Sequence, residues 1–147
     1  TLTYSSAYGF FGLLILMNWQ QVGYMMIIYV AGIQNIPGEL IEAAKIDGAT
    51  NRQLLRHVTI PMVMPSITIC TFLTLTNAFK LYDQNLALTA GEPSNKSELL
   101  ALNIYNTFYG RTGWEGVGQA KAVIFFLAVA VIALIQLRLT RSKEVQA

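Results

Sequence analysis

Charged residues are scarce in this sequence. Only 12% of the 147 residues are Asp, Glu, Lys or Arg, whereas 54% are hydrophobic and the mean hydropathy is +0.46. Soluble globular chains carry roughly 25% charged residues, so the composition indicates a membrane protein. The formal net charge of +2 is small and the basic residues are dispersed. A nucleic-acid-binding protein is therefore not expected.

Cysteine and histidine are almost absent as well. Cys70 and His57 are the single examples of each, so they can form neither an internal disulfide nor a metal site. Cys70 lies in an apolar run, where we expect it to be a packing residue. The sequence also lacks a phosphate-binding loop, a zinc-protease motif and a nucleophile elbow. We therefore expect no catalytic residue, metal or cofactor in this chain.

Three apolar runs are long enough to cross a bilayer as helices. They cover residues 7–33, 58–79 and 117–137, and about 20 helical residues suffice to span the hydrocarbon core. Buried helices of a large soluble protein are the alternative, which the low charge content disfavours. Pro61 and Pro65 are expected to loosen the first turns of the second run, although Pro61 would equally suit a helix entry. The predicted fold class is an all-α membrane protein with three transmembrane helices.

Lysine and arginine predict the orientation of these helices. Six basic residues lie in the segment between the first two runs and in the tail, against four in and beside the stretch between the second and third runs: Lys45, Arg52, Arg56, Arg138, Arg141 and Lys143 against Lys80, Lys96, Arg111 and Lys121. The positive-inside rule therefore predicts that residues 34–57 and the C-terminus are cytoplasmic. Residues 80–116 are then an extracytoplasmic segment. We expect a short helix at 99–109, and its neighbourhood holds aromatic residues suited to a membrane interface: Tyr105, Phe108, Tyr109 and Trp114.

The predicted cytoplasmic loop reads QNIPGELIEAAKIDGATNRQLLRH. Pro37 suits the first turn of a helix that continues through 39–46, and Gly48 suits its end because glycine accepts a positive φ. Thr50 followed by Gln53 is a capping-box pattern, which predicts a second short helix leading toward His57. The loop is therefore expected to form a helix-turn-helix between two membrane spans.

This loop resembles the EAA loop of ABC importer permeases. The pattern is Glu42-Ala43-Ala44, then Gly48, then Val58-Thr59-Ile60-Pro61 at the family's spacing. Val58 and Ile60 replace the usual isoleucine and leucine, and both keep apolar bulk. The longer run IPGELIEAAKIDGAT is similar to the carbohydrate-uptake subfamily, which includes the maltose-system permeases.

The resemblance extends along nearly the whole chain. Tyr82-Asp83 and the run at 89–93 resemble a family segment in which Glu92 stands where a second glycine is usual, so a different turn is expected there. Residues 118–122 open the last span in the family manner. Such permeases are about twice as long and have six or more spans. The resemblance thus implies that residues 1–147 are the C-terminal part of an ABC transporter transmembrane domain.

The resemblance also implies partners for the chain. In this family the loop couples the permease to two nucleotide-binding ATPase subunits, which hold ATP and magnesium. A second homologous permease, an extracellular solute-binding protein and the bilayer of a bacterial cell membrane complete the assembly. The implied coupling residues are Glu42, Ala43, Ala44, Asp47, Gly48 and Pro61. Glu42 would contact the ATPase, although a solvated charge on a helix is the alternative.

Polar residues inside the spans are the candidate substrate contacts. Asn18, Gln20 and Gln21 interrupt the first apolar run, and polar groups at that depth are functional candidates by default. By resemblance to the maltose-system permeases, sugar contacts map onto Gln20, Gln21, Tyr24, Thr74, Asn77 and Leu81. Two alternatives remain open, because threonine often bonds its own helix backbone and amide side chains often join membrane helices.

These features predict a permease subunit that imports a sugar or oligosaccharide. One alternative is an ABC permease for a polyol, a glycerol phosphate or an amino acid. An anion carrier should add basic groups inside the membrane, and the first two spans contain none. The other alternative is a membrane anchor or enzyme subunit that transports nothing.

Overall fold

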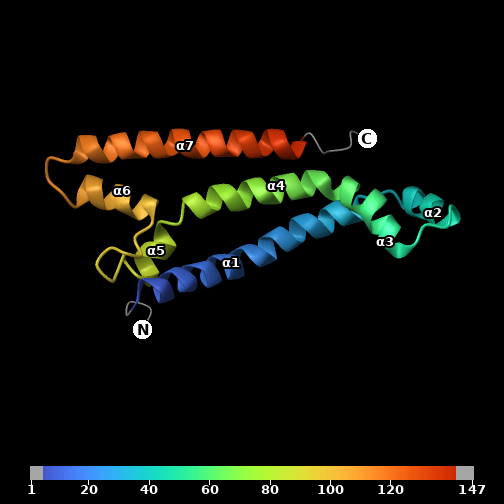
Figure 1. Cartoon of the computed structure of the whole chain (residues 1–147), viewed down its shortest axis with the longest axis horizontal. Helices are drawn as coiled ribbons and strands as arrows, with labels where there is room; N and C mark the ends of the chain where they lie inside the picture. The colour runs from blue at the N-terminus through green and yellow to red at the C-terminus, as the bar shows by residue number, and fades with distance from the viewer. Residues whose placement is uncertain (1–4, 142–147) are drawn as a thin grey trace. The chain divides into compact units, whose positions relative to one another are not determined.

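The computed structural model describes residues 5–141, and the chain is helical in that range, with no strand. Figure 1 shows the order of the helices along the chain. The elements are α1 (Ser6–Gln34), α2 (Gly38–Ile46), α3 (Asn51–Leu54), the π-helical turn η1 (Leu55–Thr59), α4 (Ile60–Phe79), α5 (Asp83–Leu88), α6 (Leu100–Tyr109) and α7 (Glu115–Arg141).

Three continuous helices are long and apolar enough to cross a membrane: Ser6–Gln34, Asn51–Phe79 and Glu115–Arg141. They have 29, 29 and 27 residues, and a rise of about 1.5 Å per residue makes each longer than the roughly 30 Å hydrocarbon core. Large apolar side chains such as Ile27 and Phe126 are exposed on them. Lipid or other membrane helices must cover this surface. The predicted all-α fold with three membrane helices is confirmed.

The second membrane helix begins earlier than its sequence predicts. The sequence favours a separate short helix before a span starting at residue 58, but α3, η1 and α4 run on without a break. In η1 the N–H of Ile60 bonds the carbonyl of Leu55. Pro61 has no N–H with which to bond the carbonyl four residues earlier, so a wider turn is accommodated just before it. The prolines loosen the helix without ending it.

Two groups of residues each pack among themselves. Within the described residues, one unit joins residues 5–21 with Thr74–Ala133, and the other joins Val22–Leu73 with residues 134–141. In the second unit, Gly32 of α1 faces Ser66 and Val63 of α4, and a Cβ on Gly32 would clash with the Ser66 side chain. Small residues allow membrane helices to approach closely. The buried Cys70 nearby is a packing residue, as predicted.

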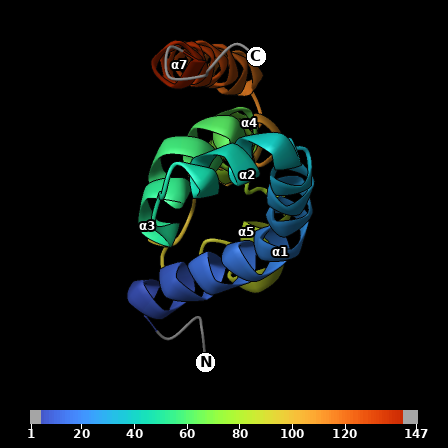
Figure 2. The same ribbon diagram turned by 90° about the vertical axis from the view of Figure 1, so that its right-hand side faces the viewer.

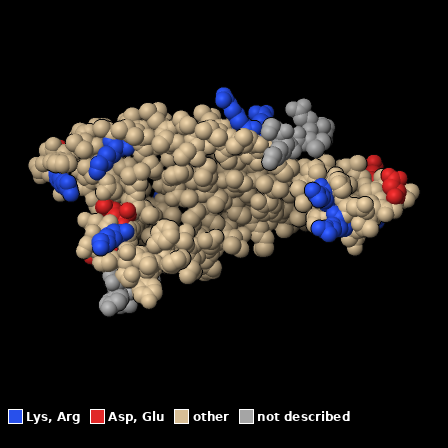
Figure 3. Space-filling view, viewed as in Figure 1, with Lys and Arg blue, Asp and Glu red and all other residues tan. Residues whose placement is uncertain are grey.

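The first unit is built around α5, α6 and the start of α7. Leu102 is completely buried, and the rings of Phe79 and Phe125 meet edge to face at 6.1 Å. The predicted helix at 99–109 is present as α6, whereas no pattern in the sequence predicts α5. On the face shown in Figure 3, charged side chains gather over α2 and α3, beside the end of α7, and around α6 and the start of α7, while the long stretches of the membrane helices between them show none.

Gly118 lets α7 approach α6, and its replacement is expected to cost stability. A Cβ at this position would lie 2.8 Å from Cα and Cβ of Phe108, so Gly118→Ala must displace backbone. Such overpacking costs about 1–3 kcal/mol. Gly116→Ala is the matched control, because nothing lies within 4 Å of a Cβ there. Thermal unfolding of the purified protein in detergent should show a lower midpoint temperature for Gly118→Ala and an unchanged one for Gly116→Ala. Equal midpoints for both variants would contradict the close contact between Gly118 of α7 and Phe108 of α6.

Candidate functional site

The turn between α2 and α3 is held by a specific backbone arrangement. The N–H of Gly48 bonds the carbonyl of Lys45, and the N–H of Ala49 bonds the carbonyl of Ala44, both at 3.0 Å. This pair of bonds is the Schellman ending of a helix, which requires a left-handed residue at the position of Gly48. Its φ is +79°. The chain therefore reverses in very few residues and presents a tight turn.

The other side of the turn is fixed by side chains. The backbone N–H of Thr50 donates to Oε1 of Gln53 at 2.9 Å, and the N–H of Gln53 donates to Oγ1 of Thr50 at 3.4 Å. The predicted capping box is confirmed. Figures 1 and 2 both show α2 and α3 beside each other, close to the start of α4. The turn is thus defined by hydrogen bonds from both helices that flank it.

The surface of this turn is open to a partner. Glu42, Ala43, Asp47 and Gly48 are exposed, and Ala44 is half-buried. None of the residues of α2 is buried, and the side chain of Ile46 is 85% exposed. The sixth predicted coupling residue, Pro61, lies apart from the turn in the first turn of α4, beyond α3 and η1.

The predicted substrate residues lie on two membrane helices and just beyond the second. Gln20, Gln21 and Tyr24 are on α1, Thr74 and Asn77 are on α4, and Leu81 follows α4. Gln21 and Leu81 are half-buried, while the other four side chains are exposed. Their role as sugar contacts stays a prediction.

Some of the polar side chains in the membrane helices have hydrogen-bond partners within the chain. Oε1 of Gln20 accepts a hydrogen bond from Nε2 of Gln84 in α5 at 3.4 Å, a partner that the sequence did not suggest. Asn18 instead donates to the carbonyl of Leu14 in its own helix at 2.7 Å, and Thr71 bonds its helix backbone in the same way. For Asn18 and Thr71 the structure therefore favours backbone bonding within the helix.

Asn85 organises the segment between α5 and α6, and sequence reasoning missed it. Its side chain is completely buried. Nδ2 donates to Oγ1 of Thr89 at 3.0 Å and to the carbonyl of Ser97 at 2.9 Å, while Oδ1 accepts from the N–H of Leu99 at 2.8 Å. One amide thus closes a loop of 14 residues. Asn85 is also the only buried residue of α5. Because its neighbours in the sequence include other polar residues, the sequence did not indicate that this one is buried.

A second polar cluster connects α6 with α7. The carboxylate of Glu98 accepts from Nδ2 of Asn103 at 2.7 Å and from Nδ2 of Asn106 at 2.6 Å. Nζ of Lys121 donates to Oδ1 of Asn103 and to Oγ1 of Thr107, both at 2.8 Å. A cavity of about 240 Å³ lies beside these residues. Asn103 and Thr107 are one helical turn apart, and that spacing is the sequence signal that could have indicated the cluster.

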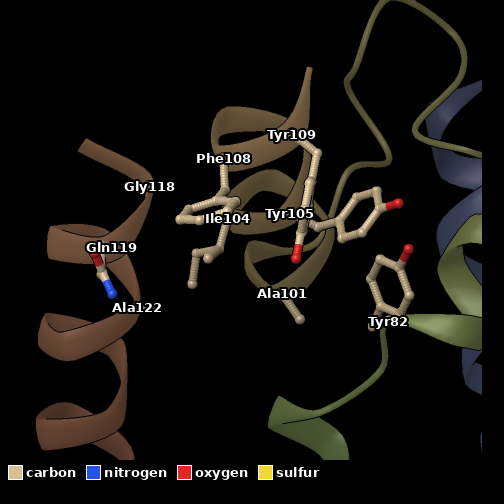
Figure 4. A pocket seen from close by; sticks show the side chains of 9 residues that line it. All are labelled: Tyr82, Ala101, Ile104, Tyr105, Phe108, Tyr109, Gly118, Gln119 and Ala122. Atoms are coloured by element: carbon tan, nitrogen blue, oxygen red, sulfur yellow. The ribbon is translucent and has the colours of Figure 1, made fainter. Parts of the chain in front are cut away.

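An aromatic cavity of about 430 Å³ lies on the other side of α6. Ring centroids of Tyr82 and Tyr105 are 4.8 Å apart, as are those of Tyr105 and Tyr109. In Figure 4, Phe108 is directed toward α7 and the rings of Tyr82 and Tyr105 face each other. Partial burial, and then the hydrogen bond with Tyr105, raise the pKa of Tyr82. Its phenol therefore stays neutral and is able to donate and accept hydrogen bonds.

Residues 2–144 match the family described as the binding-protein-dependent transport system inner membrane component. The chain belongs to this family. The resemblance drawn from the E-A-A segment is confirmed. The family description is that of a transport component of a membrane, so the chain is part of such a component.

Several relatives of this inner membrane component are named for sugars or starch products. It is 52% identical over 94% of its length to the "Probable starch degradation products transport system permease protein" of Thermoanaerobacterium thermosulfurigenes. It is 35% identical over 86% of its length to the multiple sugar-binding transport system permease protein of Streptococcus mutans. It is 31% identical over 92% of its length to the trehalose/maltose transport system permease protein of Thermococcus litoralis.

The chain spans about half the length of these curated relatives, covering 47%, 43% and 45% of them respectively. The similarity therefore concerns one part of a transport component. The relatives give no support to a polyol, glycerol phosphate or amino acid cargo, nor to an anchor that transports nothing.

Proposed function

We propose that this chain forms part of the permease of an ABC importer that moves a sugar or oligosaccharide into a bacterial cell. The observation that carries the proposal is the 52% identity, over 94% of the chain, to a permease named for starch degradation products. Such products are short α-linked glucose oligomers, which are neutral. The first two membrane helices carry no charged residue within Ser6–Gln34 or within Ile60–Phe79. Membrane helices that carry no charge suit a neutral cargo.

ATP hydrolysis would occur on partner subunits. We place one of two nucleotide-binding ATPase subunits, which hold ATP and magnesium, against the α2–α3 turn, where Glu42, Ala43, Ala44, Asp47 and Gly48 are available. Exposed ion pairs contribute only about 0–1 kcal/mol, so apolar contacts should supply most of the docking energy. Pro61 would transmit movement of the turn into α4 through the loosened η1. A second permease and an extracellular binding protein complete the proposed complex.

The proposed orientation places residues 34–57 and the C-terminus in the cytoplasm and residues 80–116 outside. Arg52 and Arg56 near the α2–α3 turn and Arg138 and Arg141 at the end of α7 support it, because basic residues favour the cytoplasmic side. The cargo would pass Gln20, Gln21, Tyr24, Thr74, Asn77 and Leu81 on its way in.

The test is ATP hydrolysis by the complete transporter reconstituted in liposomes with its binding protein. We expect maltotriose, an α-linked glucose trimer, to stimulate hydrolysis and to accumulate inside, and we expect lactose or trehalose to act less strongly. Stimulation by an amino acid or a polyol alone would keep the permease assignment and reject the sugar. An assembled complex that no solute stimulates would reject transport itself.

A further inference from the structure

The aromatic cavity beside α6 has no assigned role. It is lined by residues between the second and third membrane helices and by the first turns of α7, and none of the predicted substrate residues is part of its lining. Ala101 and Tyr105 line it one helical turn apart on α6, and Tyr82 joins them from the stretch that follows α4. Tyr105 and Tyr109 are 42% and 71% exposed, so other parts of this chain leave their rings uncovered. Its volume of about 430 Å³ is within the usual range of small-molecule sites.

We propose that this cavity is an additional carbohydrate subsite, in which a pyranose ring stacks on Tyr105 and bonds the phenols of Tyr82 and Tyr109. The proposal rests on the proposed sugar import, and it places a first contact on the extracytoplasmic side of the protein.

The chemistry of the lining favours a sugar over other occupants. Its aromatic faces offer the flat apolar surface that the C–H face of a pyranose needs, and its tyrosine hydroxyl groups offer donors and acceptors to the ring hydroxyls. Gln119 adds an amide from α7. None of the residues that line the cavity is charged, so nothing there would hold an anion or a cation by charge. Aromatic rings combined with neutral polar groups match a neutral polyhydroxylated ring better than a lipid chain, which needs no hydroxyl groups.

A thiol placed in the cavity gives a direct measure of occupancy. Ala101→Cys is a small change in the lining, Cys70, the one cysteine in these 147 residues, is buried, and the complete transporter without Ala101→Cys serves as the labelling blank. The complete transporter in lipid nanodiscs would be treated with a membrane-impermeant maleimide at increasing maltotriose concentrations. We expect maltotriose to slow the labelling of the Ala101→Cys variant. Labelling that no sugar slows would overturn the proposal, and slowing by added lipid instead would assign the cavity to lipid.

Variants of the tyrosines separate stacking from hydrogen bonding. In the Ala101→Cys background, Tyr105→Ala should raise the half-protecting maltotriose concentration about tenfold, since loss of an aromatic contact is worth roughly one power of ten. Tyr105→Phe keeps the ring and should have a smaller effect. Tyr8→Ala is the matched control, because Tyr8 is an exposed tyrosine on α1 and is not part of the lining of this cavity.

The outcomes distinguish this proposal from the proposed function. If maltotriose is imported but Tyr105→Ala and Tyr8→Ala behave alike, the subsite is wrong and sugar import stands. If maltotriose protects the thiol and Tyr105→Ala abolishes protection while no sugar is imported, the subsite stands and the proposed import is wrong.

Discussion

Replacement of Asn85 with leucine is expected to unfold the segment that connects α5 with α6. Leucine has a similar size but no amide, so the N–H of Leu99 and the carbonyl of Ser97 would lose their partner inside the protein. Each buried group left unsatisfied costs about 1–3 kcal/mol. The combined loss is large enough to open the loop locally, which hydrogen–deuterium exchange of residues 89–99 in the detergent-purified protein would detect.

Asn18→Leu provides the control for this experiment. Asn18 is an exposed asparagine whose amide bonds the carbonyl of Leu14 in its own helix. Leucine there removes a polar group from a membrane helix and leaves no buried partner unsatisfied, so exchange in residues 89–99 should not change. If Asn85→Leu exchanged as slowly as the wild type, the amide would not be what closes the loop.

The long helices and the turn between α2 and α3 could be predicted because their signals are local. An apolar run longer than a bilayer is thick is visible in the sequence, and the Thr50–Gln53 capping box joins residues only three apart. The continuity of α3, η1 and α4 was not predicted, because Arg52 and Arg56 suggest an element separate from the apolar run that starts at residue 58. The helix geometry continues through them.

The Asn85 loop could not be predicted because its bonds reach across the sequence. Ser97 and Leu99 are 12 and 14 residues away from Asn85, and no short pattern records that they meet. Helix α5 is equally hidden, since it has six residues and no side-chain cap at Tyr82. The polar residues of the first membrane helix were recognisable as candidates, but the sequence could not show that Asn18 bonds its own helix whereas Gln20 meets Gln84.

Replacement of Gly48 with valine is expected to uncouple transport from ATP hydrolysis. Gly48 has a φ of +79°, a conformation that is a genuine outlier for a β-branched residue. A left-handed residue other than glycine costs roughly 1–2 kcal/mol, and valine should exceed that. The Schellman bonds to Lys45 and Ala44 would then be distorted, and the exposed turn would no longer fit the proposed ATPase subunit. Sugar uptake by reconstituted complexes should fall by about tenfold or more.

The same loop supplies a matched control for Gly48→Val. Gly38 begins α2, does not have a positive φ, and would have nothing within 4 Å of an added Cβ, so Gly38→Val should keep uptake near the wild-type value. Gly48→Asn should retain more uptake than Gly48→Val, because asparagine tolerates the left-handed region. Sugar uptake should therefore be highest for Gly38→Val, intermediate for Gly48→Asn and lowest for Gly48→Val. This order follows from backbone conformation alone. If both valine variants lost uptake equally, bulk on the loop surface rather than the shape of the turn would govern coupling.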